Sequence, residues 1–182
     1  MNELDILKLV ASRLDSAGFD YMLSGSVALT FYGKPRMTRD IDIVVKITVE
    51  EVDGFISLFE QDFLIQKEMM VDAIKNKSMF NIIHLNSICK VDFFIRKNQE
   101  YRIVEFNKRK KKQLEDQEIS VVALEDLIIS KLCWAKDSFS EMQIKDIVSL
   151  LDLDFDRDYV KEWSTRLGLD EILGRVLDER HQ

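Results

Sequence analysis

The sequence contains few of the residues that interrupt regular structure and few that carry several common chemistries. Its 182 residues include one proline, six glycines, two cysteines and two histidines. The cysteines, Cys89 and Cys133, have no paired spacing, which excludes a disulfide scaffold and a cysteine zinc cluster, and we expect both to be small buried side chains. Two histidines are too few for a site built from several imidazole groups, so carboxylates are the expected reactive groups.

Signals for membrane insertion and secretion are also absent from the sequence. No apolar run approaches the roughly 18 to 20 residues that span a bilayer, and the first residues, MNELDILK, carry acids where a secretory signal carries positive charge. We therefore expect a cytoplasmic protein. Hydrophobic residues make up 46% of the chain, enough for a packed core rather than a disordered segment. The net charge is -7, and residues 123–182 hold 8 basic and 14 acidic residues, which disfavours a large nucleic-acid footprint.

Hydrophobic spacing predicts both strands and helices in the first two thirds of the chain and helices alone after it. The whole indicates an α/β (α+β) fold, a mixed sheet flanked by helices. We expect a catalytic domain over 1–122 and a helical region over 123–182 that packs on it. The expected strands are 21–24, 40–45, 79–85 and 90–95, and the expected helices are 3–17, a stretch to about residue 60 after the Thr48–Glu51 capping box, 124–137, 140–153, 157–167 and 170–180.

The most informative stretch is LSGSVALTFYGKPRMTRDIDIVV, residues 23–45, in which Gly25-Ser26 is followed after thirteen residues by Asp40-Ile41-Asp42. A glycine lets the backbone approach a phosphate closely, and a serine at a helix start adds a hydroxyl beside free N–H groups. Asp40 and Asp42 lie at i and i+2 of a strand, so both carboxylates point to the same face. Such hard oxygen ligands suit Mg²⁺ or Mn²⁺, and the combination predicts a site for a metal and a triphosphate.

This order of motifs resembles the nucleotidyltransferase superfamily, the DNA polymerase β-like fold, whose pattern is a hydrophobic residue, Gly-Ser or Gly-Gly, a spacer, and D-x-D or D-x-E. That family has a third carboxylate on a later strand, for which KVDFFI offers Asp92. A lone carboxylate in an apolar strand is costly, and metal coordination or an ion pair with a nearby Lys or Arg would remove the cost. The resemblance implies metal-dependent transfer of a nucleoside monophosphate from a nucleoside triphosphate to a hydroxyl, with Asp40, Asp42 and Asp92 as catalytic metal ligands and Gly25 and Ser26 at the nucleotide. The acceptor is open between RNA such as a tRNA end, a protein and a small molecule.

A second resemblance covers residues 124–151, LEDLIISKLCWAKDSFSEMQIKDIVSLL, which is similar to a bacterial subgroup related to the abortive-infection toxin nucleotidyltransferases. In that subgroup a lysine and a later aspartate follow the catalytic domain, which implies nucleotide-binding roles for Lys131 and Asp146 and a toxin–antitoxin partner. Lys131 shares a helical stripe with apolar residues, so it either contacts a phosphate or the acidic cluster, or extends to solvent. For Asp146 the alternative is a salt bridge or cap within the helical region. The arginine that the toxins place shortly after the lysine is missing, with Asp137 or a neighbour in its place.

Other charged and aromatic residues are candidates with open alternatives. Arg39, like Lys34 and Arg36, is close enough in sequence to reach a triphosphate or a nucleic-acid backbone, and it can equally pair with a carboxylate. The basic run 108–112 is expected to be a solvated loop or helix face, with RNA contact as the alternative. Trp134 and Trp163 are expected in the core, although Trp134 can also line a base pocket.

Three other interpretations compete with a nucleotidyltransferase. An aspartyl-phosphate phosphatase is disfavoured because its apolar strand precedes the first aspartate, whereas Asp40 follows a polar stretch. A calcium loop lacks its glycine and terminal glutamate. A catalytically inactive or regulatory partner with the same fold remains the alternative, since the retained motif argues against lost chemistry without excluding a regulatory use of it.

Overall fold

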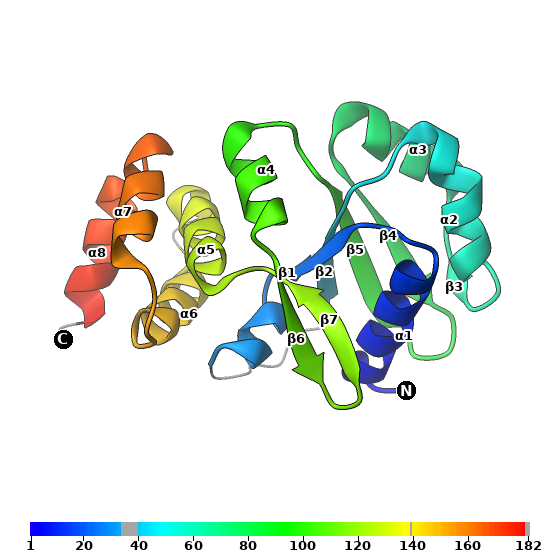
Figure 1. Ribbon diagram of the computed structural model, residues 1–182, viewed down its shortest axis with the longest axis horizontal. Coiled ribbons are helices and arrows are strands. Elements are labelled where there is room, and N and C mark those ends of the chain that lie inside the picture. The colour runs from blue at the N-terminus through cyan, green and yellow to red at the C-terminus, as the bar shows by residue number, and fades with distance from the viewer. Residues whose placement is uncertain (34–39, 139, 181–182) are drawn as a thin grey trace.

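The computed structural model describes residues 1–33, 40–138 and 140–180 of the chain. Its strands form one mixed sheet in the order β3-β4-β5-β2-β1-β7-β6 (Figure 1). Among the described residues, no helix combines the length and the apolar composition that crossing a membrane requires. In chain order the elements are α1 (Glu3–Ser16), β1 (Tyr21–Ser24), the 3-10 helix η1 (Val27–Phe31), β2 (Asp40–Val45), the 3-10 helix η2 (Val49–Glu51), α2 (Val52–Phe59), β3 (Phe63–Leu64), α3 (Lys67–Asn76), β4 (Met79–His84), β5 (Lys90–Ile95), α4 (Glu100–Asn107), β6 (Lys110–Leu114), β7 (Gln117–Val121), α5 (Leu124–Ser138), α6 (Glu141–Leu151), α7 (Arg157–Arg166) and α8 (Asp170–Arg180).

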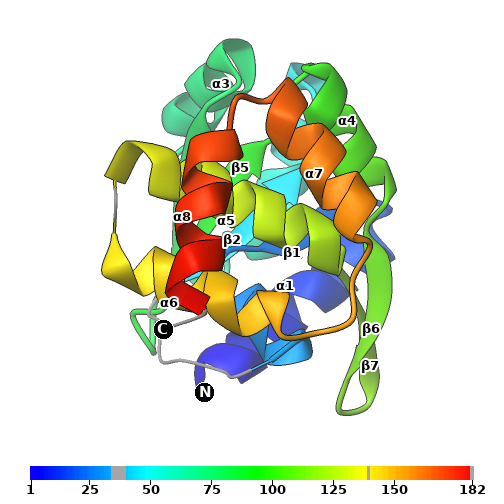
Figure 2. The same ribbon diagram turned by 90° about the vertical axis from the view of Figure 1, so that its left-hand side faces the viewer.

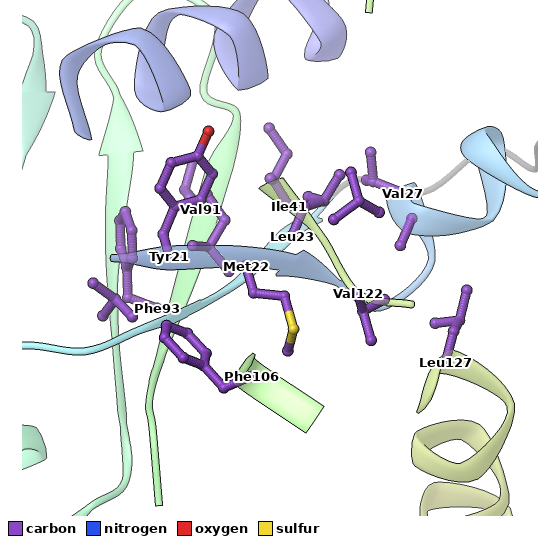
Figure 3. Packing of buried hydrophobic residues seen from close by; sticks show 14 of the residues in the cluster. Tyr21, Met22, Leu23, Val27, Ile41, Val91, Phe93, Phe106, Val122 and Leu127 are labelled. Carbon is purple, nitrogen blue, oxygen red and sulfur yellow. The ribbon is translucent and has the colours of Figure 1, made fainter. Parts of the chain in front are cut away.

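Side-chain alternation along the central strands gives the sheet two different faces. Ile41 and Ile43 of β2 lie on the apolar face and are fully buried. This face is covered by α1, whose Asp15 accepts a hydrogen bond from the hydroxyl of Tyr21 at 3.0 Å. It is also covered by α2, whose Phe55 packs against Phe93 of β5, the register partner of Ile43. Figure 3 shows the neighbouring Met22 on the opposite side of β1, directed toward Phe106 of α4. The second face, which carries both aspartates of the D-x-D motif, is therefore covered by α4 and the helical region rather than by α1.

The helical region packs on this second face through α5. Figures 1 and 2 place α5 between the sheet and the helices α7 and α8. Leu127, Ile128, Ile129 and Leu132 of this helix are fully buried, as expected for a helix that packs against protein on more than one side. Residues of α5 can therefore contribute both to the tertiary core and to any site on the second face of the sheet.

The structure confirms the elements that the sequence predicted, with ends that differ by a few residues at most. It also contains β3, α3, α4, β6 and β7, which were not predicted. The basic run was interpreted wrongly as a loop or helix face, because Lys110–Leu114 is the edge strand β6. An edge strand tolerates exposed lysines, which hinder pairing with other chains. Several cations of the run are also engaged internally: Lys108 lies over the ring of Tyr159, Lys112 over that of Tyr32, and Arg109 pairs with Asp20.

The two cysteines are half-buried rather than buried. Both still pack against the core as small side chains. Burial raises the pKa of the Cys89 thiol to about 11, so this thiol is protonated at neutral pH and is a poor nucleophile.

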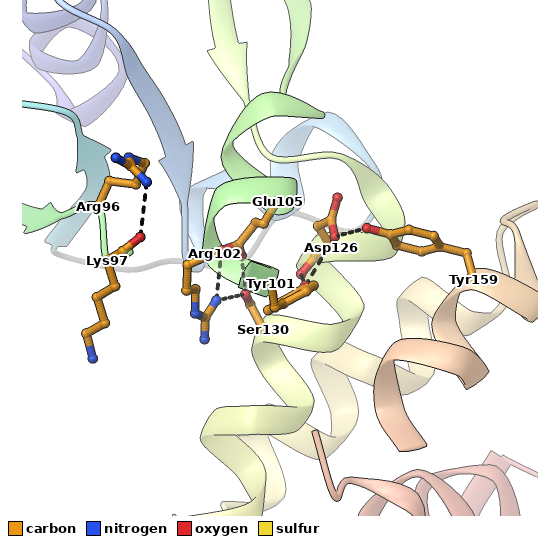
Figure 4. Close-up of polar contacts among 8 residues, drawn as sticks. All are labelled: Arg96, Lys97, Tyr101, Arg102, Glu105, Asp126, Ser130 and Tyr159. Carbon is orange, nitrogen blue, oxygen red and sulfur yellow. Dashed lines mark hydrogen bonds and ion pairs between the residues drawn. The ribbon is translucent and has the colours of Figure 1, made fainter. Parts of the chain in front are cut away.

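A buried carboxylate joins α4, α5 and α7 (Figure 4). Asp126, at the start of α5, is fully buried, and its Oδ1 accepts hydrogen bonds from the hydroxyls of Tyr159 at 2.8 Å and Tyr101 at 3.2 Å. Its Oδ2 has no hydrogen-bond partner among the described residues. Burial raises the pKa of Asp126 to about 6. The two tyrosines therefore stabilise a charge that the surrounding protein disfavours.

Tyr159→Phe is expected to lower the free energy of unfolding by about 1.5 to 3 kcal/mol, because it removes the shorter hydrogen bond to a buried charged group. Urea denaturation well above pH 6, where the Asp126 carboxylate is ionised, measures the loss. Tyr32→Phe is the matched control, since that hydroxyl donates to the neutral carbonyl of Val122 at 2.7 Å and its removal should cost only about 0.5 to 1.5 kcal/mol. Equal losses in the two variants would contradict a charged anchor at Asp126.

Candidate active site

Four polar side chains form one row across the centre of the sheet. Asp42 of β2 lies directly beside Asp92 of the parallel strand β5, and the antiparallel neighbours extend the row to Ser24 of β1 and Asn81 of β4. Residues opposite one another in a sheet point to the same face. The structure therefore brings together the three predicted carboxylates, because Asp40 lies on this face two residues before Asp42.

Lys90 neutralises part of this acidic cluster. It lies beside Asp40 in the register, and its Nζ is 2.9 Å from Asp92 Oδ2 and 3.6 Å from Asp40 Oδ1. The sequence interpretation considered a lysine partner for Asp92 without identifying it. The ion pair leaves the other oxygen of Asp92, Oδ1, buried and without a hydrogen-bond partner among the described residues. The structure thus confirms an ion pair of Asp92 with a lysine and places Asp92 beside Asp42, while its role as a catalytic metal ligand remains a prediction.

Burial and crowding change the acidity of Asp42. Burial, together with the charges of Asp92 and Asp40, raises its pKa to about 6, while the ammonium groups of Lys131 and Lys90 oppose the shift. Two like charges in a poorly solvated site disfavour each other, so a bound cation would stabilise the ionised form. Lys131 is thereby placed within electrostatic range of the cluster, although it lies far along the chain in α5.

Gly25 makes the close approach of Asp42 to the preceding turn feasible. Its φ of +62° lies in the left-handed region, which L-residues with a side chain rarely adopt. A Cβ at this position would lie 1.9 Å from Asp42 Oδ2 and 2.8 Å from Asp42 Cβ. The carboxylate of Asp42 therefore packs directly on the Gly25 backbone. Ser26 follows at the start of η1 and is buried.

A cavity of about 300 Å³ opens beside this turn and connects the sheet with the helices. Its walls come from both parts of the chain, and four of the lining side chains are basic while two are acidic. The lining residues that the argument uses are Gly25, Ser26, Asp42, Lys131, Trp134 and Arg102. This volume sits at the low end of the range for sites that enclose small molecules.

Lys131 is held in the cavity wall by Asp146 of α6. It is 3% exposed, so the alternative in which it extends to solvent was wrong. Its Nζ is 2.8 Å from Asp146 Oδ2 and 3.3 Å from Gln143 Oε1. The sequence singled out Lys131 and Asp146 separately, and the structure shows that they form one buried ion pair at the cavity.

The prediction that Trp134 lies in the core was wrong, because its side chain is 60% exposed. Trp163 is buried as expected, with 7% exposed. Trp134 lies one helical turn after Lys131 and lines the cavity. Its ring and that of Phe94 are nearly perpendicular, with 6.4 Å between ring centroids. The exposed indole is thus available to a flat ligand, the alternative that the sequence had left open.

Two further lining residues, Arg102 and Glu105, were missed because α4 was not predicted. No sequence signal distinguishes them from other charges on an amphipathic helix. Arg39, Lys34 and Arg36 lie outside the described residues, so their proposed contacts remain predictions.

The acidic cluster has the chemistry of a divalent metal site, although its side chains are not yet arranged as one. Within the described ranges, no three His, Cys, Asp or Glu side chains are placed to hold a metal ion together. The ammonium group of Lys90 instead lies against two of the carboxylates, Asp40 and Asp92. The unpartnered Oδ1 of Asp92 and the raised pKa of Asp42 both fit carboxylates that would gain from a bound cation.

No family model and no curated protein sequence matches the chain, but several solved structures do. The antibiotic-resistance factor ANT(2'')-Ia aligns with a TM-score of 0.62 and 11% identity over 98% of this chain and 96% of its own. A nucleotidyltransferase-like protein from Paracoccidioides brasiliensis aligns with a TM-score of 0.59 and 16% identity over 96% and 91%. The lincosamide antibiotic adenylyltransferase LnuA, with lincomycin bound, aligns with a TM-score of 0.54 and 12% identity over 85% and 99%. The chain has the nucleotidyltransferase fold, and the predicted fold class is confirmed.

Asp42→Asn is expected to raise the free energy of unfolding by up to about 3 kcal/mol above pH 6. The pKa of Asp42 is about 6 in the fold against an ordinary 3.8, so ionised Asp42 destabilises the folded state. This penalty shrinks as pH falls through 6 and is absent below 3.8, where both states hold the proton. Denaturant melts of both proteins across this pH range measure the difference. Asp53→Asn, at a carboxylate that is 80% exposed, is the control and should change the free energy of unfolding little at any pH. If Asp42→Asn changes the free energy of unfolding by the same amount at every pH, the raised pKa of Asp42 is not the cause.

Lys131→Met is expected to destabilise the protein by about 3 to 5 kcal/mol, because it strands the buried carboxylate of Asp146. The double variant Lys131→Met with Asp146→Leu should recover most of that loss, since it removes both charges from the same buried place. Lys161→Met, at an exposed lysine of α7, controls for the loss of a positive charge. If the single variant is as stable as the control, the ion pair does not anchor α5 to α6.

Proposed function

We propose that the protein is a metal-dependent nucleotidyltransferase that moves a nucleoside monophosphate from a nucleoside triphosphate to a hydroxyl acceptor. The observation that carries the proposal is the row of Asp42 and Asp92 beside the Gly25 turn, at a cavity with a basic wall. The nucleotidyltransferase fold of the chain supports the same reaction.

Each part of the site has a role in this reaction. The backbone at Gly25 and Ser26 binds the triphosphate, and Lys131 compensates its charge from α5. Mg²⁺ or Mn²⁺, held by Asp40, Asp42 and Asp92, would neutralise charge on the phosphates and lower the pKa of the attacking hydroxyl. The acceptor oxygen bonds to the α-phosphorus, the bond to the bridging oxygen breaks, and pyrophosphate leaves. Asp92, which lies beside Asp42 in the register, accepts the hydroxyl proton.

The names of two structural neighbours support a small-molecule acceptor, since one is an antibiotic-resistance factor and another a lincosamide adenylyltransferase. A small acceptor also agrees with the cavity of about 300 Å³ and with the basic run 108–112, in which Lys108, Lys111 and Lys112 make internal contacts. An RNA end and a protein hydroxyl are the other acceptors to test. The toxin–antitoxin partner and the cytoplasmic location remain predictions.

The decisive test incubates the protein with each α-labelled nucleoside triphosphate, Mg²⁺ or Mn²⁺, and separate acceptor pools of small molecules, RNA and protein. Transfer should depend on the divalent ion and be lost in Asp42→Asn, while Asp53→Asn transfers normally. Nucleotide binding without transfer to any pool would favour the regulatory partner, and absence of both would overturn the enzyme assignment.

Trp134 allows nucleotide binding to be measured separately from transfer, because the sequence contains two tryptophans. In Trp163→Phe the remaining indole, that of Trp134, lies at the cavity, so its fluorescence should change when nucleotide and Mg²⁺ bind. In Trp134→Phe the remaining indole is buried, so the same titration should give little signal. Trp134→Ala should weaken nucleotide binding by about 1 to 3 kcal/mol if the base stacks on the indole. Unchanged affinity in calorimetry would place the base elsewhere.

A further inference from the structure

A second charged cluster lies in the wall of the same cavity, formed by α4 and α5 rather than by the sheet (Figure 4). Arg102 Nη1 is 2.8 Å from Glu105 Oε2 and 2.9 Å from Ser130 Oγ. Ser130 Oγ in turn donates to Glu105 Oε1 at 2.5 Å. Glu105 is 3% exposed, and both of its oxygens are used inside this cluster. The guanidinium is therefore held in a fixed position.

Most donors of Arg102 are left for a ligand. Only Nη1 takes an acceptor among the described residues, so Nη2 and Nε keep their N–H groups free for other partners. The side chain remains 27% exposed, and it lines the cavity. A guanidinium presents its N–H groups as a planar fork that matches a phosphate or a carboxylate. A tie between α4 and α5 alone would not require a charged fork at a cavity wall.

Arg102 approaches the cavity from α4 beside Ser130, the residue before Lys131 in α5. The other two basic lining residues, Arg96 and Lys97, follow β5 beyond Ile95, whose register partner is Val45 and not Asp42. We call the part of the cavity lined by Arg96, Lys97 and Arg102 the distal end; Figure 4 shows these three residues. The distal end thus has three cations, with Glu105 as its acidic lining residue, and it favours an anion over a cation.

We propose that Arg102, positioned by Glu105 and Ser130, binds an anionic group that the acceptor carries, a phosphate or a carboxylate. This inference rests on the proposed function, in which the triphosphate occupies the end near Asp42 and Lys131. The acceptor then lies between Arg102 and the acidic cluster, with its hydroxyl toward Asp92. A polycationic acceptor would meet like charges at Arg96, Lys97 and Arg102.

The test uses inorganic phosphate as the probe of the distal end. Calorimetry follows its binding to protein that is first saturated with Mg²⁺ and a non-hydrolysable triphosphate analogue. Arg102→Met is expected to weaken phosphate binding by about tenfold to a hundredfold, the loss of hydrogen bonds to a charged group. If the single variant folds poorly, the double variant Arg102→Met with Glu105→Gln replaces it, because it leaves no buried carboxylate without a partner. The double variant should show the same loss of phosphate binding. Arg109→Met, which removes a guanidinium from the β6 side of the molecule, is the matched control and should bind phosphate normally.

Nucleotide affinity, read from Trp134 fluorescence, distinguishes this inference from the proposed function. Unchanged nucleotide affinity in Arg102→Met with lost phosphate binding supports the acceptor site, and equal loss of both overturns it because Arg102 would then serve the triphosphate. No phosphate binding to the wild-type protein also overturns it. Phosphate binding that depends on Arg102 in a protein that binds no nucleotide supports the anion site and overturns the proposed function.

Transfer assays then identify the source of the anionic group. Small-molecule extracts are separated by anion exchange before the reaction, and total RNA is assayed beside them. Label in the retained fraction indicates a small anionic acceptor, and label on RNA indicates a chain end that carries its own phosphates. Label confined to neutral or cationic small molecules would contradict the inference.

Discussion

Repulsion among three carboxylates on one face of two neighbouring strands is the constraint on which the rest of this structure depends. Asp42 and Asp92 lie side by side in the register, and Asp40 shares their face. Burial and the charges of Asp92 and Asp40 together raise the pKa of Asp42, and two lysines from different elements oppose that shift. Apolar side chains in place of these carboxylates would stabilise the fold more. The acidic cluster therefore lowers the stability of the protein locally, as binding sites commonly do.

The lysines that oppose the repulsion come from both the sheet and the helical region, so the site depends on both parts of the chain. Lys90 comes from β5 itself, whereas Lys131 comes from α5 and is held by Asp146 of α6. The packing of α5 on the second sheet face therefore positions a cation beside the carboxylates, and the packing of α6 on α5 keeps that cation in place. Stability of the helical region is thus coupled to the electrostatics of the site.

Local patterns carried most of what the sequence could predict. Alternation along β2 and β5 and the glycine before η1 identified the acidic face, since both depend on residues near one another in the chain. The lysines of β6 were misread because an edge strand of exposed side chains has no hydrophobic period. Trp134 was misplaced because spacing along α5 does not show which of its residues are covered by other elements. The pairing of Lys131 with Asp146 spans two helices, so spacing along one helix could indicate two buried charges but not their contact.

The charge of the whole protein and the charge of its cavity have opposite signs, and this difference bears on the acceptor. The chain has a net charge of -7, which repels a long polyanion at low ionic strength. Arg96, Lys97 and Arg102 nevertheless gather at one end of the cavity. Screening limits the field of distant surface charges to about 10 Å, whereas hydrogen-bonded contacts inside a cavity are screened much less. Local attraction therefore governs a ligand that enters the cavity, and the overall field governs one that must lie along the surface. This arrangement favours an acceptor with one or two anionic groups over an extended nucleic acid.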